Sequence, residues 1–228
     1  MKVLQRVPLS VFLFLLLFSA CKEKSKVPDT ATINSLYLKR GDIIACGPAD
    51  KQFGAVSFAT SCSPHTQQDL NLALSLLHSF EYDESEKAFA NIIDKEPDCA
   101  IAYWGVAMSN YHPLWAAPTP VELEKGAKAI AIAQSLSDKS EKEEAYIEAT
   151  ALFYRDWKNV DHRTRSNNFA KAIEKIYTVS PTDKEAAIFY ALALTATADP
   201  ADKTFVNQKK AGAILTELYK ADPNHPGV

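Results

Sequence analysis

The chain has 228 residues, of which 47% are hydrophobic and 23% are charged, the balance that is usual for a soluble globular protein. Its formal net charge is −3, and the basic residues are scattered among acidic ones, so a basic surface that would bind nucleic acid is not expected. Only 7 glycines occur, while alanine and leucine recur at spacings near 3.6 residues. The composition therefore predicts an all-α fold and excludes nucleic acid as the expected partner.

Residues 1–20 have the pattern of an export signal. Basic residues precede an apolar run that is too short to span a bilayer, and small residues precede Cys21. The ending FSAC at residues 18–21 resembles a bacterial lipobox, in which the cysteine is lipidated and becomes the mature N-terminus, although leucine is usual where Phe18 stands. The resemblance implies a lipid anchor in the bacterial cell envelope, facing the periplasm or the cell surface. The alternative is an ordinary cleaved signal in which Cys21 has no role.

Two non-repetitive segments follow. Residues 21–45 begin charged and small and are predicted to form a tether. Residues 46–65 contain glycine and proline but no helical period, so they are expected to be irregular and to need a covalent link. Cys46 and Cys62 bracket most of this segment, and a disulfide between them in an oxidising compartment would contribute about 3 kcal/mol. A metal or redox pair is the weaker alternative because no C-x-x-C occurs, and Cys99 is interpreted as a small buried hydrophobic residue.

The rest of the chain, residues 66–223, shows helical periodicity broken by polar turns and prolines. Each helix has one apolar face that it cannot bury alone, so successive helix pairs must stack. The acidic clusters at 83–87 and 141–148 are interpreted as solvent-exposed helix faces, and the polar sequence 161–163 as part of a loop. The helices are expected at about 66–80, 83–95, 100–111, 121–136, 142–157, 167–179, 183–196 and 205–221.

The first helix pair carries a repeat signature. Ile92, Phe89, Ser85 and Ala73 precede Pro97 by 5, 8, 12 and 24 residues, which resembles the tetratricopeptide repeat. Later pairs end in comparable polar turns with proline. The resemblance covers roughly residues 66–223 and implies a helical-hairpin solenoid with a groove that binds a protein or peptide partner.

Longer stretches resemble a set of bacterial exported tetratricopeptide proteins. They are residues 62–89, 99–115 and 199–212. Members of that set continue past the turn at 224–228 into further helices rich in histidine. The resemblance therefore implies that the chain is truncated at its C-terminus and that 224–228 begin a further repeat.

Histidines and aromatic residues are the candidate site residues. In this repeat family positions 5, 12 and 13 commonly face the groove, and on that register His78, His112, Trp104 and Tyr111 share one surface, with Trp115 beside it. Aromatic faces bind apolar or cationic groups. The alternative is that the histidines bond helix ends and that the aromatic side chains pack the groove floor.

The same register suggests a metal site, because neutral imidazoles coordinate transition metals. His78 and His112 supply only two ligands, so a third would have to come from Glu81, His225 or residues beyond the chain. No catalytic motif, phosphate loop or dinucleotide fingerprint occurs, so no catalytic residue and no cofactor is assigned. The leading interpretation is a membrane-anchored scaffold that binds a protein or peptide, and the alternative is a metal-dependent or enzymatic module completed by further residues.

Overall fold

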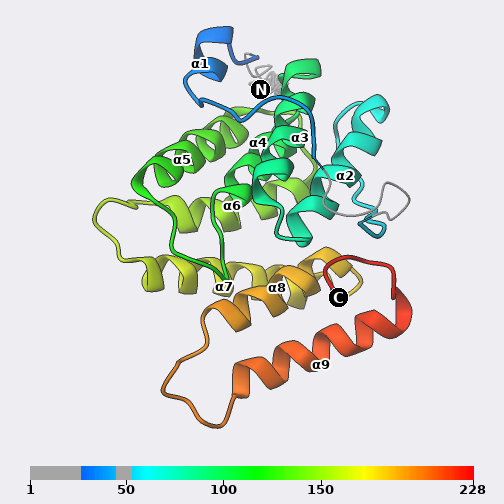
Figure 1. Cartoon of the computed structure of the whole chain (residues 1–228), viewed down its shortest axis with the longest axis vertical. Coiled ribbons are helices and arrows are strands. Elements are labelled where there is room, and N and C mark those ends of the chain that lie inside the picture. The colour runs from blue at the N-terminus through cyan, green and yellow to red at the C-terminus, as the bar shows by residue number, and fades with distance from the viewer. Residues whose placement is uncertain (1–26, 45–52) are drawn as a thin grey trace, which may run out of the picture.

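The computed structural model describes residues 27–44 and 53–228, and these residues form helices without any strand (Figure 1). The predicted all-α fold is confirmed for this part of the chain. The export signal, Cys21 and Cys46 lie outside the described residues. The elements are α1 (Thr30–Asn34), the 3-10 turn η1 (Pro64–Thr66), α2 (Gln67–His78), α3 (Tyr82–Lys95), α4 (Ala100–Ser109), α5 (Pro120–Ser135), α6 (Glu141–Tyr154), α7 (His162–Val179), α8 (Lys184–Ala196) and α9 (Val206–Ala221).

Side chains at the helix N-termini explain where several helices begin. In α5 and α6, Thr119 and Ser140 form capping boxes with glutamates three residues later. In α7 the carboxylate of Asp161 accepts a hydrogen bond from the Thr164 N–H at 3.0 Å. Helix α7 therefore begins at His162, five residues before the predicted start, and the expectation of a loop at 161–163 is wrong.

Consecutive helices pack against one another from α2 to α9, and α4 also contacts α2 and α6. Every residue of α4 is buried, so this helix lies at the centre of the core. A β-carbon at Gly105 would lie 2.2 Å from the ring of Phe89, and one at Gly126 would lie 2.2 Å from the ring of Tyr154. Close approach at these two glycines lets α4 pack on α3 and α5 on α6. At the far end α9 packs mainly on α8 (Figure 1).

The prediction that residues 21–45 form a tether is wrong for residues 36–40. Leu36 and Leu38 are buried, and the Lys39 N–H donates to the carboxylate of Glu86 at 2.8 Å. The guanidinium of Arg40 binds both carboxylate oxygens of Asp94, at 3.0 and 2.7 Å. Because two apolar side chains enter the core here, the chain is docked on α3 well before residue 45.

The predicted disulfide between Cys46 and Cys62 is wrong, because Cys62 is bonded to Cys99 with a Cα–Cα distance of 5.2 Å. The Ser63 N–H donates to Glu96 at 2.7 Å, which holds the segment before α2 against the turn between α3 and α4. Cys99 is the N-cap residue of α4 at the end of that turn. The prediction paired the two cysteines that are closest in the sequence, but the folded chain brings Cys62 next to Cys99 instead.

The described part of the irregular segment, residues 53–63, has no regular helix, as predicted. It is nevertheless packed, since Val56 and Phe58 are buried. The Ala55 N–H donates to the Asn224 carbonyl at 2.9 Å, which joins this segment to the turn after α9. The turn after α9 is thereby held against residues that precede α2.

Candidate functional site

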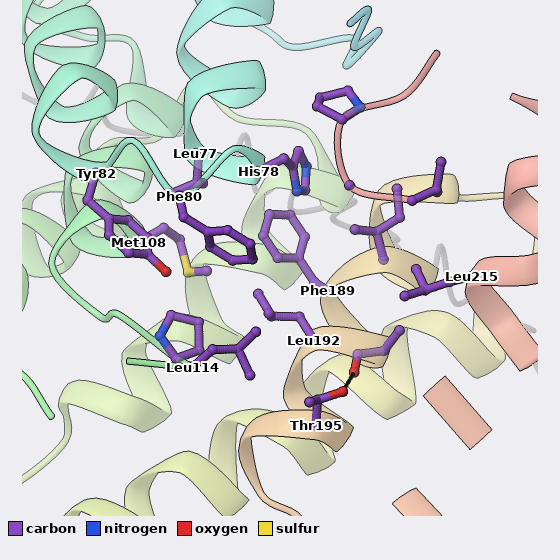
Figure 2. Close-up of a pocket in the computed structure, with 16 residues that line it drawn as sticks. Leu77, His78, Phe80, Tyr82, Met108, Leu114, Phe189, Leu192, Thr195 and Leu215 are labelled. Carbon is purple, nitrogen blue, oxygen red and sulfur yellow. Dashed lines mark hydrogen bonds between the residues drawn. The ribbon is translucent and has the colours of Figure 1, made fainter. Parts of the chain in front are cut away.

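An apolar pocket of about 280 Å³ lies between α2, α8 and α9, the loop after α4 and residues 226–228 (Figure 2). Its wall includes Leu77, Met108, Phe189, Leu192 and Leu215. Burial of apolar surface stabilises binding by roughly 25 cal/mol per Å². The pocket is therefore suited to apolar groups.

Phe80 is brought to the pocket by the way α2 ends. The Phe80 N–H donates to the Leu77 carbonyl at 3.1 Å, and the Glu81 N–H donates to the Leu76 carbonyl at 3.0 Å. These two bonds form a Schellman motif, in which the residue after the C-cap adopts a left-handed conformation. Phe80 has φ +62°, and its ring lines the pocket and makes an edge contact with Trp115 at 5.9 Å between ring centroids.

Tyr82, the first residue of α3, supplies a polar atom beside the pocket (Figure 2). Its hydroxyl is buried and has no hydrogen-bond partner among the described residues. Burial raises the pKa of this phenol well above its usual value, so the group is a neutral donor. A buried unpaired hydroxyl is costly, and an acceptor on a bound molecule would satisfy it.

Next to the apolar pocket, His78, Glu185 and His225 form a buried cluster, and His78 belongs to both features. His78 ends α2, Glu185 lies in the first turn of α8, and His225 lies in the turn after α9. Nε2 of His78 is 2.7 Å from Oε2 of Glu185, and Nε2 of His225 is 2.7 Å from Oε1. The three side chains are only 3%, 4% and 3% exposed.

The carboxylate of Glu185 is ionised despite its burial. Burial raises its pKa, but attraction by His78 and hydrogen bonds from both imidazoles outweigh burial and lower the pKa to about 2. In the described part of the chain its hydrogen bonds and ion pairs are only to these two histidines. The positive charge that offsets this carboxylate must therefore lie on the imidazoles or on a bound cation.

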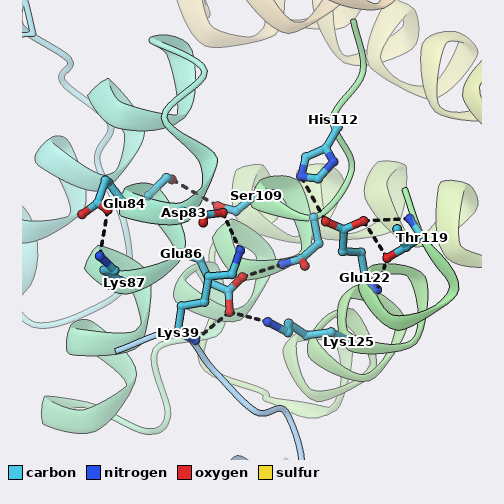
Figure 3. A network of polar contacts seen from close by, with 12 residues as sticks. Lys39, Asp83, Glu84, Glu86, Lys87, Ser109, His112, Thr119, Glu122 and Lys125 are labelled. Carbon is cyan, nitrogen blue, oxygen red and sulfur yellow. Dashed lines mark hydrogen bonds and ion pairs between the residues drawn. The ribbon is translucent and has the colours of Figure 1, made fainter. Parts of the chain in front are cut away.

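A second buried carboxylate, Glu86, has different surroundings (Figure 3). It accepts hydrogen bonds from Lys125 Nζ at 2.7 Å, Asn110 Nδ2 at 3.0 Å and the Lys39 N–H at 2.8 Å. The lysine supplies the balancing charge, so this network is complete without a ligand. Glu86 and Glu143 are both buried, so the expectation of solvent-exposed acidic clusters at 83–87 and 141–148 is wrong for these two residues.

The structure separates the residues that the repeat register grouped together. Trp104 and Tyr111 lie in the core and not on a groove: Nε1 of Trp104 donates to Thr150 at 2.9 Å, and Tyr111 packs on Phe153 with centroids 3.7 Å apart. For these two, the alternative of aromatic packing agrees with the structure. Trp115 is 63% exposed and, through its contact with Phe80, stands at the pocket rim.

His112 does not join His78 in a metal site. It has φ +51°, and its ring packs on Tyr82. Its Nε2 lies 3.9 Å from Glu122 Oε1 (Figure 3). Of the residues considered for a third ligand, His225 lies in the cluster and Glu81 does not. The carboxylate that completes the cluster, Glu185, was missed because an acidic residue in the first turn of an apolar helix is ordinary.

Within residues 27–44 and 53–228, no helix combines the length and hydropathy that a membrane span requires. No protein-family model, curated protein or solved structure matches the chain. The likeness to tetratricopeptide repeats therefore remains a resemblance of sequence pattern.

Proposed function

We propose that the chain is a membrane-tethered scaffold of tetratricopeptide-like helical hairpins that binds a peptide segment of another protein in the bacterial envelope. The observation that carries this proposal is the apolar pocket with the exposed aromatic side chain of Trp115 at its rim. Trp and Tyr are enriched among the residues that dominate binding at protein interfaces.

Size and polarity both favour a peptide as the occupant. A volume of about 280 Å³ is at the lower end of the range for small-molecule sites, and it accommodates one or two apolar side chains better than a large cofactor. A peptide also brings backbone carbonyls, and one of them could accept a hydrogen bond from the unpaired hydroxyl of Tyr82.

The helical-hairpin solenoid is the part of the proposal that concerns architecture. Its support is the sequential packing of α2 through α9, which an array of stacked hairpins requires. In such an array each hairpin contacts its neighbours, so a binding surface can be built from successive repeats.

The membrane tether rests on the lipobox-like sequence that ends at Cys21. Acyl chains gain about 0.8 kcal/mol per buried methylene, so a multiply acylated cysteine holds a globular domain at a membrane. Radiolabelled palmitate should enter the wild-type chain in cells and should not enter Cys21→Ser. Equal labelling of both chains would contradict the anchor and would leave the pocket proposal intact.

Site-specific cross-linking tests the pocket. A photoreactive phenylalanine analogue at position 192, in the pocket wall, should capture a defined envelope polypeptide, whereas the analogue at exposed position 128 on α5 should not. The cross-linked segment should contain clustered apolar residues, and a synthetic peptide of that segment should bind the purified chain.

Two aspartate substitutions, one in the pocket wall and one on an exposed helix face, test whether the peptide binds in the pocket. Leu192→Asp should weaken binding of this peptide at least about 10-fold, a loss of about 1.4 kcal/mol. Leu72→Asp, on the exposed side of α2, should leave the affinity unchanged. Equal capture from positions 128 and 192, or a peptide affinity that Leu192→Asp does not change, would overturn the proposal.

A further inference from the structure

We propose that His78, Glu185 and His225 bind a divalent transition-metal ion such as Zn²⁺. This site adjoins the apolar pocket and shares His78 with it. Three segments far apart in the sequence bring the donors together: residues 78 and 185 are separated by 107 positions, and residues 185 and 225 by 40.

The donor set has the chemistry of a transition-metal site. Two imidazole nitrogens and one carboxylate oxygen lie within 4.8 Å of one another. Imidazole with carboxylate suits zinc and the neighbouring divalent ions, whereas magnesium and calcium prefer oxygen ligands alone. Three protein ligands leave the fourth position of a tetrahedral ion open to water or to a bound molecule, whereas a structural zinc site has four protein ligands.

Charge favours a cation at the same place. The two imidazole nitrogens face the two oxygens of the Glu185 carboxylate, and all three side chains are almost fully buried. A buried charge without a balancing charge is strongly destabilising. The carboxylate of Glu86 is paired with the ammonium group of Lys125, whereas in the described residues the carboxylate of Glu185 is paired only with the imidazoles of His78 and His225. A divalent ion would balance the carboxylate directly.

Two openings give access to the cluster. His78 lines the apolar pocket, while Glu185 and His225 line a second, polar pocket together with Lys142 and Asp222. The polar pocket offers a path for a hydrated ion. The apolar pocket would place a bound molecule beside the ion.

Ion binding would change the hydrogen bonds of the cluster. Each neutral imidazole that binds the ion through Nε2 must carry its proton on Nδ1. In His225 the Nδ1 atom accepts a hydrogen bond from the Gly227 N–H at 3.1 Å, and this bond must be released. Residues 226–228 line the apolar pocket, so the bound ion would alter one wall of that pocket.

Calorimetry with the purified full chain, free of chelator and without a histidine tag, tests the proposal. Titration with ZnCl₂ should give one high-affinity site per chain. His78→Ala, Glu185→Gln and His225→Ala should each weaken binding at least about 100-fold, more than loss of a group that only orients a ligand. His65→Ala and His112→Ala, which remove histidines outside the cluster, should bind as the wild type does.

Cobalt provides a measurement that needs no variant. Co²⁺ bound to the wild-type chain should show the intense visible absorption bands of a four-coordinate ion. Addition of Zn²⁺ should displace the Co²⁺ and abolish these bands. Absence of these bands, absence of a high-affinity zinc site, or zinc binding that the three cluster variants leave unchanged would each overturn the proposal. Leu192→Asp should bind zinc as the wild type does. Failure of the zinc proposal can therefore be distinguished from failure of the peptide proposal.

Discussion

Phe80 occupies a backbone position that glycine usually fills. Its φ of +62° lies in the left-handed region, where a residue with a β-carbon costs roughly 1–2 kcal/mol. The same conformation sends the aromatic ring to the pocket, where it touches Trp115. Because the ring is partly exposed, its packing only partly offsets this backbone cost, which favours a role of Phe80 in binding.

Two substitutions at this position separate the backbone cost from the role of the ring. Phe80→Gly should be more stable than Phe80→Ala by about 1 kcal/mol, because only glycine adopts a left-handed conformation without strain. Both should weaken binding of a peptide that occupies the pocket. Urea unfolding and peptide titration measure the two effects. Equal stability of the two variants would contradict the strain, and wild-type binding by both would contradict the role of the ring.

For individual residues, the sequence predicted only part of the site. His78 was identified from its repeat position, and this residue does lie at the junction of pocket and cluster. The same register placed Trp104 on a groove, but the structure buries this side chain between α4 and α6. A repeat register predicts which side of a helix a residue occupies. It does not predict whether another helix packs on that side. Glu185 could not be found without knowing that α2 and α8 meet.

At the scale of helices, hydrophobic spacing and proline stops located all of α2 to α9, because both signals are local. The start of α7 differs from the prediction because the carboxylate of Asp161 caps the helix before the apolar spacing begins. The disulfide was mispaired because Cys62 meets Cys99 only when the segment before α2 folds back on the turn before α4. Contacts of this kind depend on tertiary structure, which local spacing does not encode.

The disulfide joins the segment before α2 to α4 and should stabilise their contact. Its loop spans 37 residues, for which chain entropy predicts about 4 kcal/mol of stabilisation. Cys99→Ser should therefore lower the free energy of unfolding by about this amount in urea without reductant. Cys46→Ser is the control and should leave stability unchanged. Recovery of a linked Cys46 and Cys62 peptide under non-reducing conditions would contradict the assignment.

Across the whole molecule, stability should fall from the centre towards α9. All residues of α4 are buried, whereas Ala211 is the buried residue of α9, and Ile214, Leu215 and Leu218 are only partly covered. Local opening takes least free energy where few apolar contacts are lost. Helix α9 packs mainly on α8, so it can detach without disturbing the remaining helices.

Amide hydrogen exchange measures this gradient directly. Amides of α9 should exchange on the order of 100-fold faster than those of α4, which open only with the whole domain. Zinc should then raise the protection of α9 with little effect elsewhere, since an ion held by His225 would tie the turn after α9 to α2 and α8. The His225→Ala chain should retain the gradient and lose the zinc effect. Equal protection of α4 and α9 in the absence of zinc would show instead that the helices unfold as one cooperative unit.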